Sequence, residues 1–287
     1  MGFNHLVAIA GGGVEDRNTL ATAVHLALRH SASLEVLPAH PDAAMDMIAL
    51  GVTLGAHLSA DALNQLAVAD DGAQGVIEAL THAEAQAQGL GPSAAPGGPG
   101  FRVLRPGLRP AIDLAAWLDL ADMVVFSQAY LDLGDRLRAV LGEALILCRA
   151  PVLVSRGPMG RPVEIAAVAW DGSLQAGRAV RAALPLLAEA SRVVIVQQPT
   201  GVDRSQGDAD AGRLRSYLEA RGVSVQDRHV VPPGDEGREL LAAARSHDAD
   251  LFVAGAYGHS RLREIVFGGA TQTFLHDADG PSLLLAH

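Results

Sequence analysis

Short apolar runs alternate with longer amphipathic segments along most of the chain. The runs consist mainly of Val, Ile, Leu and Ala and end at Gly, Pro or polar residues, as strands buried on both faces do. The segments between them, such as residues 20–30 and 179–190, place Ala and Leu at helical spacing. Strands that alternate with helices indicate βαβ units and a parallel sheet.

The order of these segments repeats once along the chain. Residues 6–12 (LVAIAGG) match residues 167–173 (AVAWDGS), because each is an apolar run that ends in a glycine turn. Later runs match in the same order: 34–41 with 192–199, 121–126 with 249–254, and 150–155 with 280–286. A repeat of this length indicates a duplicated domain. We predict two tandem α/β domains, residues 1–155 and 162–287, each with a doubly wound, mostly parallel, five-stranded sheet.

The first half carries an insertion between its second and fourth strands. Residues 62–89 are expected to form two helices, and residues 89–100 are expected to form a flexible loop because they are rich in Gly and Pro. This insertion is either a lid that binds a partner or a surface elaboration. Residues 155–162 (SRGPMGRP) form the linker between the halves.

Composition excludes several classes of chemistry. The net charge is −10 and no basic tract occurs, so nucleic acids and anionic membranes are not expected partners. All 22 basic residues are arginine, which excludes a P-loop lysine or a Schiff-base lysine. Cys148 is the single cysteine, so neither an intrachain disulfide nor a CxxC metal site is expected.

The sequence lacks targeting and membrane signals. The N-terminus has no basic region followed by a long apolar one, and no apolar stretch is long enough to span a bilayer. We therefore expect a soluble, cytoplasmic protein.

Four glycines follow the apolar run at residues 251–254. Gly255 and Gly258 open a loop, and Gly268 and Gly269 lead into a helical segment. Ligands of open α/β sheets bind beyond the carboxyl ends of the strands. The start of a helix offers backbone N–H groups and a positive dipole end, which favour phosphate. The spacing predicts a phosphate site here.

These features resemble the universal stress protein family, and the resemblance covers both halves, as in a tandem member. Nucleotide-binding members carry G-x2-G-x9-G-[S/T] after the fourth strand, and Gly269 replaces the final Ser or Thr here. The family also places an aspartate after the first strand, which corresponds to Asp171. The resemblance implies that the second half binds ATP or AMP, with Mg²⁺ as an accompanying ion. The implied cofactor-binding residues are Asp171, Gly172, Ser173, Gln198, Gly255, Gly258, His259, Gly268, Gly269, Ala270 and Thr271.

Individual residues of this set have different expected roles. The resemblance places Asp171 near the ribose and Gln197 or Gln198 near the adenine. Thr271 is expected to replace the hydroxyl that Gly269 lacks, and His259 lies either against phosphate or in solvent. The alternative is that the glycines only shape a loop.

The first half lacks the corresponding residues. Ala10 stands where the aspartate is expected, and Ser127 and Tyr130 stand where Gly255 and Gly258 do. A tyrosine side chain would occupy the space that phosphate needs. We expect one nucleotide site per chain, in the second half.

Two functions remain at this stage. One is a universal stress protein that binds an adenine nucleotide and acts in the stress response through regulated interaction with protein partners. The other is a scaffold of the same type that does not bind nucleotide. In both, the last strands of the halves are expected to pair as an internal pseudo-dimer, and a further homodimer stays open. No catalytic residues and no metal-ligand set are found, so at most slow ATP hydrolysis is expected.

Overall fold

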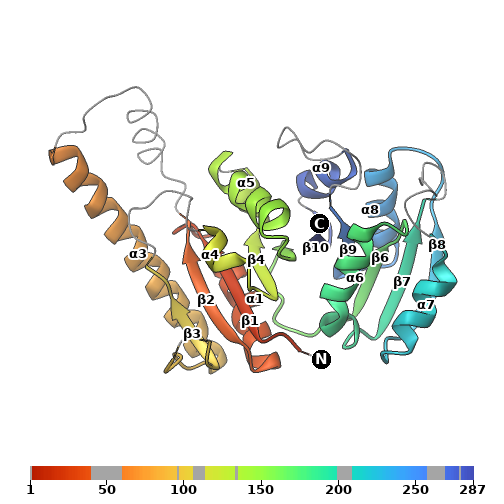
Figure 1. Ribbon diagram of the computed structural model, residues 1–287, viewed down its shortest axis with the longest axis horizontal. Coiled ribbons are helices and arrows are strands. Elements are labelled where there is room, and N and C mark those ends of the chain that lie inside the picture. The colour runs from red at the N-terminus through yellow and green to blue at the C-terminus, as the bar shows by residue number, and fades with distance from the viewer. Residues whose placement is uncertain are drawn as a thin grey trace.

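The computed structural model describes residues 2–39, 60–95, 97–105, 114–132, 135–198, 209–256, 269–277 and 279–287. Its strands form one ten-stranded sheet in the order β3-β2-β1-β4-β5-β10-β9-β6-β7-β8 (Figure 1). The first five strands are β1 His5–Ala10, β2 Ser33–Pro38, β3 Gly100–Val103, β4 Met123–Ser127 and β5 Val152–Ser155. The other five are β6 Ile165–Ala169, β7 Arg192–Gln197, β8 Val225–Val230, β9 Leu251–Gly255 and β10 Ser282–Ala286.

All strand pairs within each half are parallel, and the halves meet in one antiparallel pair. Leu153 of β5 lies opposite Leu284 of β10 at this joint. The predicted α/β class and the predicted pairing of the last strands are therefore confirmed. The two expected sheets are continuous, because the joint extends the hydrogen-bond ladder from one half into the other. Among the described helices, none has the length and apolar character needed to cross a membrane.

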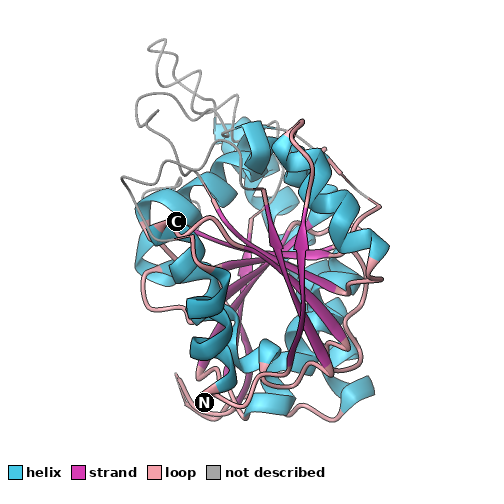
Figure 2. Ribbon diagram, turned by 90° about the vertical axis from the view of Figure 1, so that its right-hand side faces the viewer, coloured by secondary structure: helices cyan, strands magenta, loops and turns pink. Residues whose placement is uncertain are grey.

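Helices cover both faces of the sheet (Figure 2). One face carries α1 Asp16–His30, α3 Ala60–Gln88, α6 Leu174–Leu187 and α7 Ala211–Glu219. The other carries α4 Leu114–Leu118, α5 Asp135–Gly142, the π-helical segment η3 Glu143–Leu147, α8 Glu236–Ser246 and α9 Gly269–His276. The 3-10 turn η2, Gln128–Leu131, follows β4.

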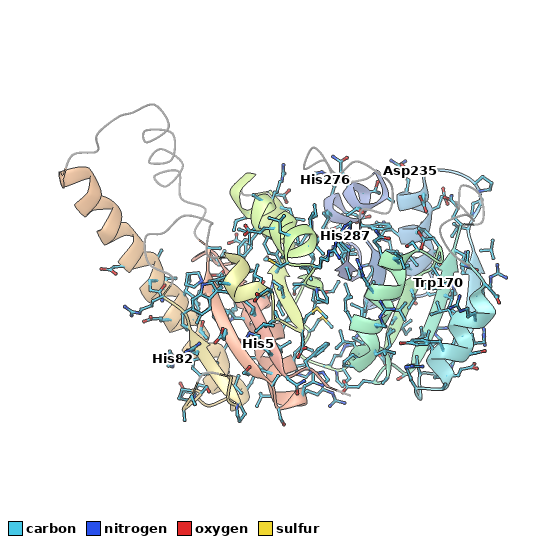
Figure 3. All side chains as sticks on the ribbon, in the orientation of Figure 1. His5, His82, Trp170, Asp235, His276 and His287 are labelled. Carbon is cyan, nitrogen blue, oxygen red and sulfur yellow. The ribbon has the colours of Figure 1, made fainter. Side chains whose placement is uncertain are left out.

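Equivalent aspartates bind the starts of the first strands of the two halves. Asp122 Oδ2 accepts hydrogen bonds from the backbone N–H groups of Asn4 and His5, which begins β1 (Figure 3). Asp250 Oδ2 accepts from the N–H groups of Glu164 and Ile165, which begins β6. Each aspartate immediately precedes the fourth strand of its half. The shared contact shows that the repeat in the sequence is also a repeat of structure.

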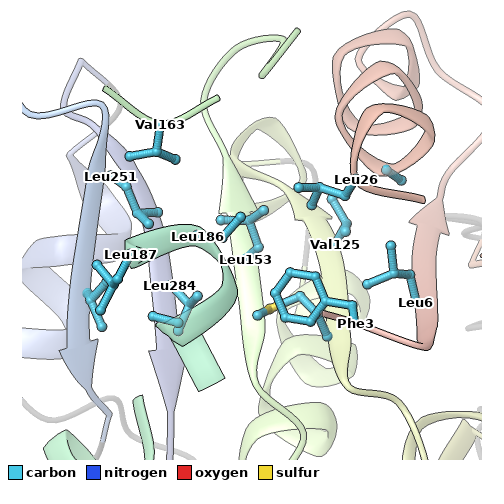
Figure 4. Packing of buried hydrophobic residues seen from close by; sticks show 14 of the residues in the cluster. Phe3, Leu6, Leu26, Val125, Leu153, Val163, Leu186, Leu187, Leu251 and Leu284 are labelled. Carbon is cyan, nitrogen blue, oxygen red and sulfur yellow. The ribbon is translucent and has the colours of Figure 1, made fainter. Parts of the chain in front are cut away.

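The core has two layers, one on each face of the sheet, and each layer contains residues of both halves. Successive residues of β1 alternate between the layers, with Leu6 in one and Val7 in the other. Leu153 and Leu284 pack with Leu186 of α6 where the halves meet (Figure 4). Burial of these side chains on both sides of the joint holds the halves together.

The insertion differs from its prediction. A single helix of 29 residues, α3, replaces the two expected helices. Gly72 and Gly75 lie inside it, and an interior glycine costs about 1 kcal/mol relative to alanine. Packing offsets this, because Ile77 and Ala85 are fully buried in the layer that contains α1. The helix ends at Gly89, which has a φ of 85°.

Candidate functional site

The turn after β6 is fixed by its own side chains. Asp171 Oδ1 accepts a 2.9 Å hydrogen bond from the backbone N–H of Ser173, and Ser173 Oγ accepts one of 3.1 Å from Ala176 N–H at the start of α6. Gly172 has a φ of 79°, a conformation that favours glycine. The turn therefore holds the half-buried Asp171 carboxylate at the carboxyl end of β6, as ligand binding would require.

Gly255 has a packing role that the sequence did not indicate. A Cβ atom there would lie 2.6 Å from Ala176 N and 2.9 Å from Gln175 Cβ. The absence of a side chain therefore lets the first turn of α6 approach β9. The sequence predicts a ligand against Gly255. On the side where a Gly255 side chain would be, the structure has the first turn of α6.

Helix α9 begins without a capping side chain among its first two residues. In the same half, Ser173, Asp210 and Asp235 cap α6, α7 and α8 with side-chain oxygens. Gly269 and Ala270 have no such oxygen, and a Cβ atom at Gly269 would meet nothing within 4 Å. The start of α9 is therefore the helix terminus in this half that is best suited to an external anion.

Thr271 lies in the first turn of α9 but is 4% exposed. Burial of this residue argues against the substitute hydroxyl expected there. Gly258, His259 and Gly268 lie outside the described residues.

Two glutamines join the ends of neighbouring strands beside this turn. Gln197 donates from Nε2 to the carbonyl oxygens of Trp170 and Ala209, at 3.1 and 2.7 Å. Gln198 donates from Nε2 to Pro232 O at 3.0 Å, so its side chain is engaged and only its backbone is suited to adenine. Trp170 lies at the β6–β7 part of the sheet (Figure 3), and its buried Nε1 has no hydrogen-bond partner among the described residues.

The first half shows which residue replaces Asp171. Leu6 pairs with Met123, the first residue of β4, as Ala166 pairs with Leu251, the first residue of β9. In this register Gly11, not Ala10, corresponds to Asp171. The two glycines that follow, Gly12 and Gly172, share a positive φ of 86° and 79°. The sequence alignment was wrong by one residue because both turns are short and rich in glycine.

The turn of the first half is filled by its own side chains. Asp16 accepts hydrogen bonds from Gly11 N–H at 3.0 Å and from Gly12 N–H at 2.8 Å. Tyr130 is fully buried, and its hydroxyl oxygen accepts a 2.7 Å hydrogen bond from Gly11 N–H. A carboxylate and a phenol thus occupy the backbone donors that would otherwise face an anion.

Asp16 was missed in the sequence. Its signal is a carboxylate five residues after Gly11 in the run GGGVED. Burial is the main cause that raises its pKa to about 6, while the hydrogen bonds from Gly11 and Gly12 act in the opposite direction. The corresponding residue of the second half is Ala176, which has no side-chain acceptor.

One cavity lies away from this site. It has a volume of about 500 Å³ and is lined by linker residues and by the residues that precede β6, β9 and β10. It therefore lies at the amino ends of these strands, whereas Asp171 lies at a carboxyl end. Within the described ranges, no cluster of three or more His, Cys, Asp or Glu residues could hold a metal ion.

Part of the chain matches a known protein family. Residues 164–285 match the model of the universal stress protein family. Universal stress protein Slr1230 of Synechocystis sp. is 28% identical over 117 residues, which span 40% of this chain and 40% of that protein.

Two solved structures cover the whole fold. A universal stress protein from Archaeoglobus fulgidus is 12% identical, with a TM-score of 0.67 over 99% of this chain and 96% of that one. A putative universal stress protein from Pseudomonas aeruginosa is 14% identical, with a TM-score of 0.54 over 99% of this chain and 93% of that one. These likenesses show a shared fold across both halves. The family match assigns a universal stress protein domain to residues 164–285.

Proposed function

We propose that the second half binds one adenine nucleotide, ATP or AMP, at the carboxyl ends of β6 and β9. The observation that carries this proposal is the contrast between the halves. Asp16 and Tyr130 fill the turn of the first half, whereas the second half has Ala176 in place of Asp16 and a helix start at Gly269 and Ala270 that has no side-chain oxygen of its own. The glycine pattern after β9, which resembles that of nucleotide-binding members, supports the same assignment.

Each part of a nucleotide has a matching group in this arrangement. The phosphates would bind at the start of α9, where the backbone dipole favours anions. The Asp171 carboxylate would accept hydrogen bonds from the ribose hydroxyls, and the Gln198 backbone would contact adenine. Asp171 is one hard oxygen ligand, and the phosphates would supply others, so the residues fit Mg²⁺ bound together with the nucleotide.

Binding of nucleotide would act through the surface of the protein rather than through turnover. No group among the described site residues is placed as a nucleophile with an orienting base. We infer that occupancy of the site alters the surface that the protein offers to protein partners in the cytoplasm during stress. Hydrolysis, if present, would depend on positioning alone.

The test is to identify what the purified protein carries. The protein is denatured, and released small molecules are identified by liquid chromatography with mass spectrometry. About one adenine nucleotide per chain is expected. If none is released, calorimetric titration with ATP and Mg²⁺ decides. The absence of heat at millimolar ATP would contradict the proposal, and two sites per chain would contradict the assignment of the first half.

An interaction scaffold is the second candidate function. The side chains that fill the turn of the first half favour it for that half, because they stabilise the turn without a ligand. The start of α3 also extends away from the sheet (Figure 1). An empty site in both assays would make this the better description of the whole chain.

A further inference from the structure

One side chain of the first half, Gln128, and one of the linker, Arg156, contact the end of α9. Gln128, on η2, donates from Nε2 to the carbonyl oxygen of Leu275. Arg156, which follows β5, donates from one terminal nitrogen to Phe274 O and from the other to Pro281 O, the latter at 2.9 Å. The two side chains are also bonded to each other, because Arg156 Nε donates to Gln128 Oε1 at 3.2 Å.

These contacts satisfy backbone carbonyl groups at the C-terminal end of a helix. The last carbonyl groups of a helix have no partner within the helix, and the C-terminus carries a partial negative charge. Phe274 and Leu275 are in the last turn of α9, so the first half and the linker supply donors there, and Arg156 adds a positive charge. Hydrogen bonds that involve a guanidinium are stronger than neutral ones.

The site around Arg156 is built for that residue. Arg156 is half-buried, and Gly280 passes so close that a Cβ atom there would lie 2.4 Å from Arg156 Nη1. Burial lowers the pKa of Arg156 to about 10, which still leaves it charged at neutral pH. Gln128 is 7% exposed. The close packing leaves the end of α9 little freedom to move relative to the first half.

The other end of α9 is the proposed phosphate site. The helix has 8 residues, so its ends are separated by about 12 Å. A helix this short moves as one body, and fixing its C-terminus also fixes the direction of its N-terminal N–H groups. Tyr130, two residues after Gln128 on η2, bonds the turn of the first half. Hydrogen bonds of η2 therefore connect the turn of the first half, through Tyr130, to the end of α9, through Gln128.

We propose that Gln128 of the first half and Arg156 of the linker are positioning residues for the nucleotide site of the second half, because they hold α9 by its C-terminal carbonyl groups. This inference rests on the proposed function for its ligand. It also gives the first half a role that requires no ligand of its own. The first half would act as the fixed support against which the phosphate-binding helix is aligned.

The test compares variants that remove contacts across the joint. Arg156→Met removes all the guanidinium bonds, and Gln128→Glu removes only the donor to Leu275 O while keeping an acceptor for Arg156. Arg29→Met is the matched control, because the Arg29–Glu189 ion pair also joins the halves but does not contact α9. ATP dissociation constants are measured by calorimetry, and amide hydrogen exchange of α9 is measured without nucleotide.

We expect ATP binding about tenfold weaker in Arg156→Met and severalfold weaker in Gln128→Glu, with no change in Arg29→Met. Exchange in α9 should be faster in the first two variants only. Equal ATP affinity in all three variants would overturn the inference while leaving the proposed function intact. If the unmodified protein binds no nucleotide, the proposed function fails. Hydrogen exchange of α9 then decides whether Gln128 and Arg156 hold this helix in place. Unchanged exchange in α9 would overturn it.

Discussion

The hydroxyl oxygen of Tyr130 lies 2.7 Å from the backbone nitrogen of Gly11 and accepts its hydrogen bond. The same N–H group also donates to Asp16. Two acceptors from different elements therefore converge on a donor that, in a ligand-binding turn, would face the ligand. The first half has kept the shape of the turn, including the positive φ of Gly12, and has replaced the external anion by an internal carboxylate.

Asp16 should make stability depend on pH. Its pKa is raised from 3.8 to about 6 in the folded protein, so the folded state binds this proton more tightly than the unfolded state does. Its contribution to the free energy of unfolding is then fully present below pH of about 4 and is lost as pH rises through about 6. The loss amounts to about 3 kcal/mol.

Urea unfolding at several pH values tests this prediction. The matched variant is Asp16→Asn, which retains one acceptor oxygen but does not titrate. Its stability should change less than that of the unmodified protein between pH 4 and pH 6. Parallel curves for the two proteins would show that Asp16 does not titrate in this range.

Gly255→Ala should destabilise the fold even when no nucleotide is present. The new Cβ atom would lie 2.6 Å from Ala176 N, and backbone atoms cannot move aside as a flexible side chain can. Overpacking of this kind costs about 1–3 kcal/mol. Thermal and urea unfolding of the ligand-free protein measure it. An unchanged stability would mean that α6 does not pack on β9 as described.

Asp171→Ala should weaken ATP binding about tenfold, because a carboxylate that accepts hydrogen bonds from ribose hydroxyls is lost. Asp250→Ala is the control. Asp250 also accepts backbone hydrogen bonds, but at the amino end of β6, opposite the site. Calorimetry on both variants separates the two effects. Equal affinities in the two variants would remove Asp171 from the site.

Local patterns in the sequence were sufficient for the fold, but not for contacts between distant segments. Buried strands such as β9 and their order follow from apolar runs and their repetition, and the β5–β10 pairing was implied by the resemblance to the universal stress protein family. The roles of Asp16, Gln128 and Arg156 could not be predicted in this way. Each depends on a backbone group that only the folded chain brings near, as the 147-residue separation of Gln128 and Leu275 illustrates.

The prediction of two helices in the insertion was wrong for a related reason. Gly72 and Gly75 are unfavourable in a helix when considered alone. Contacts of α3 with α1 outweigh this preference in the folded protein. Tertiary packing also buries Thr271, which was expected to supply the missing hydroxyl.

Gly269→Ser should restore the residue that nucleotide-binding members have at this position. The new Cβ atom would meet no atom of the described residues within 4 Å, so the variant should fold with unchanged stability. A hydroxyl at the start of α9 would add one hydrogen bond to phosphate, worth about 1 kcal/mol, or about fivefold in affinity. Gly269→Ala is the matched control, because it adds the Cβ atom without the hydroxyl. Calorimetric titration of the three proteins with ATP and Mg²⁺ should therefore show tighter binding for the serine variant alone. Equal gains in both variants would attribute the effect to a more rigid helix start, and no gain in either would place the phosphates away from Gly269.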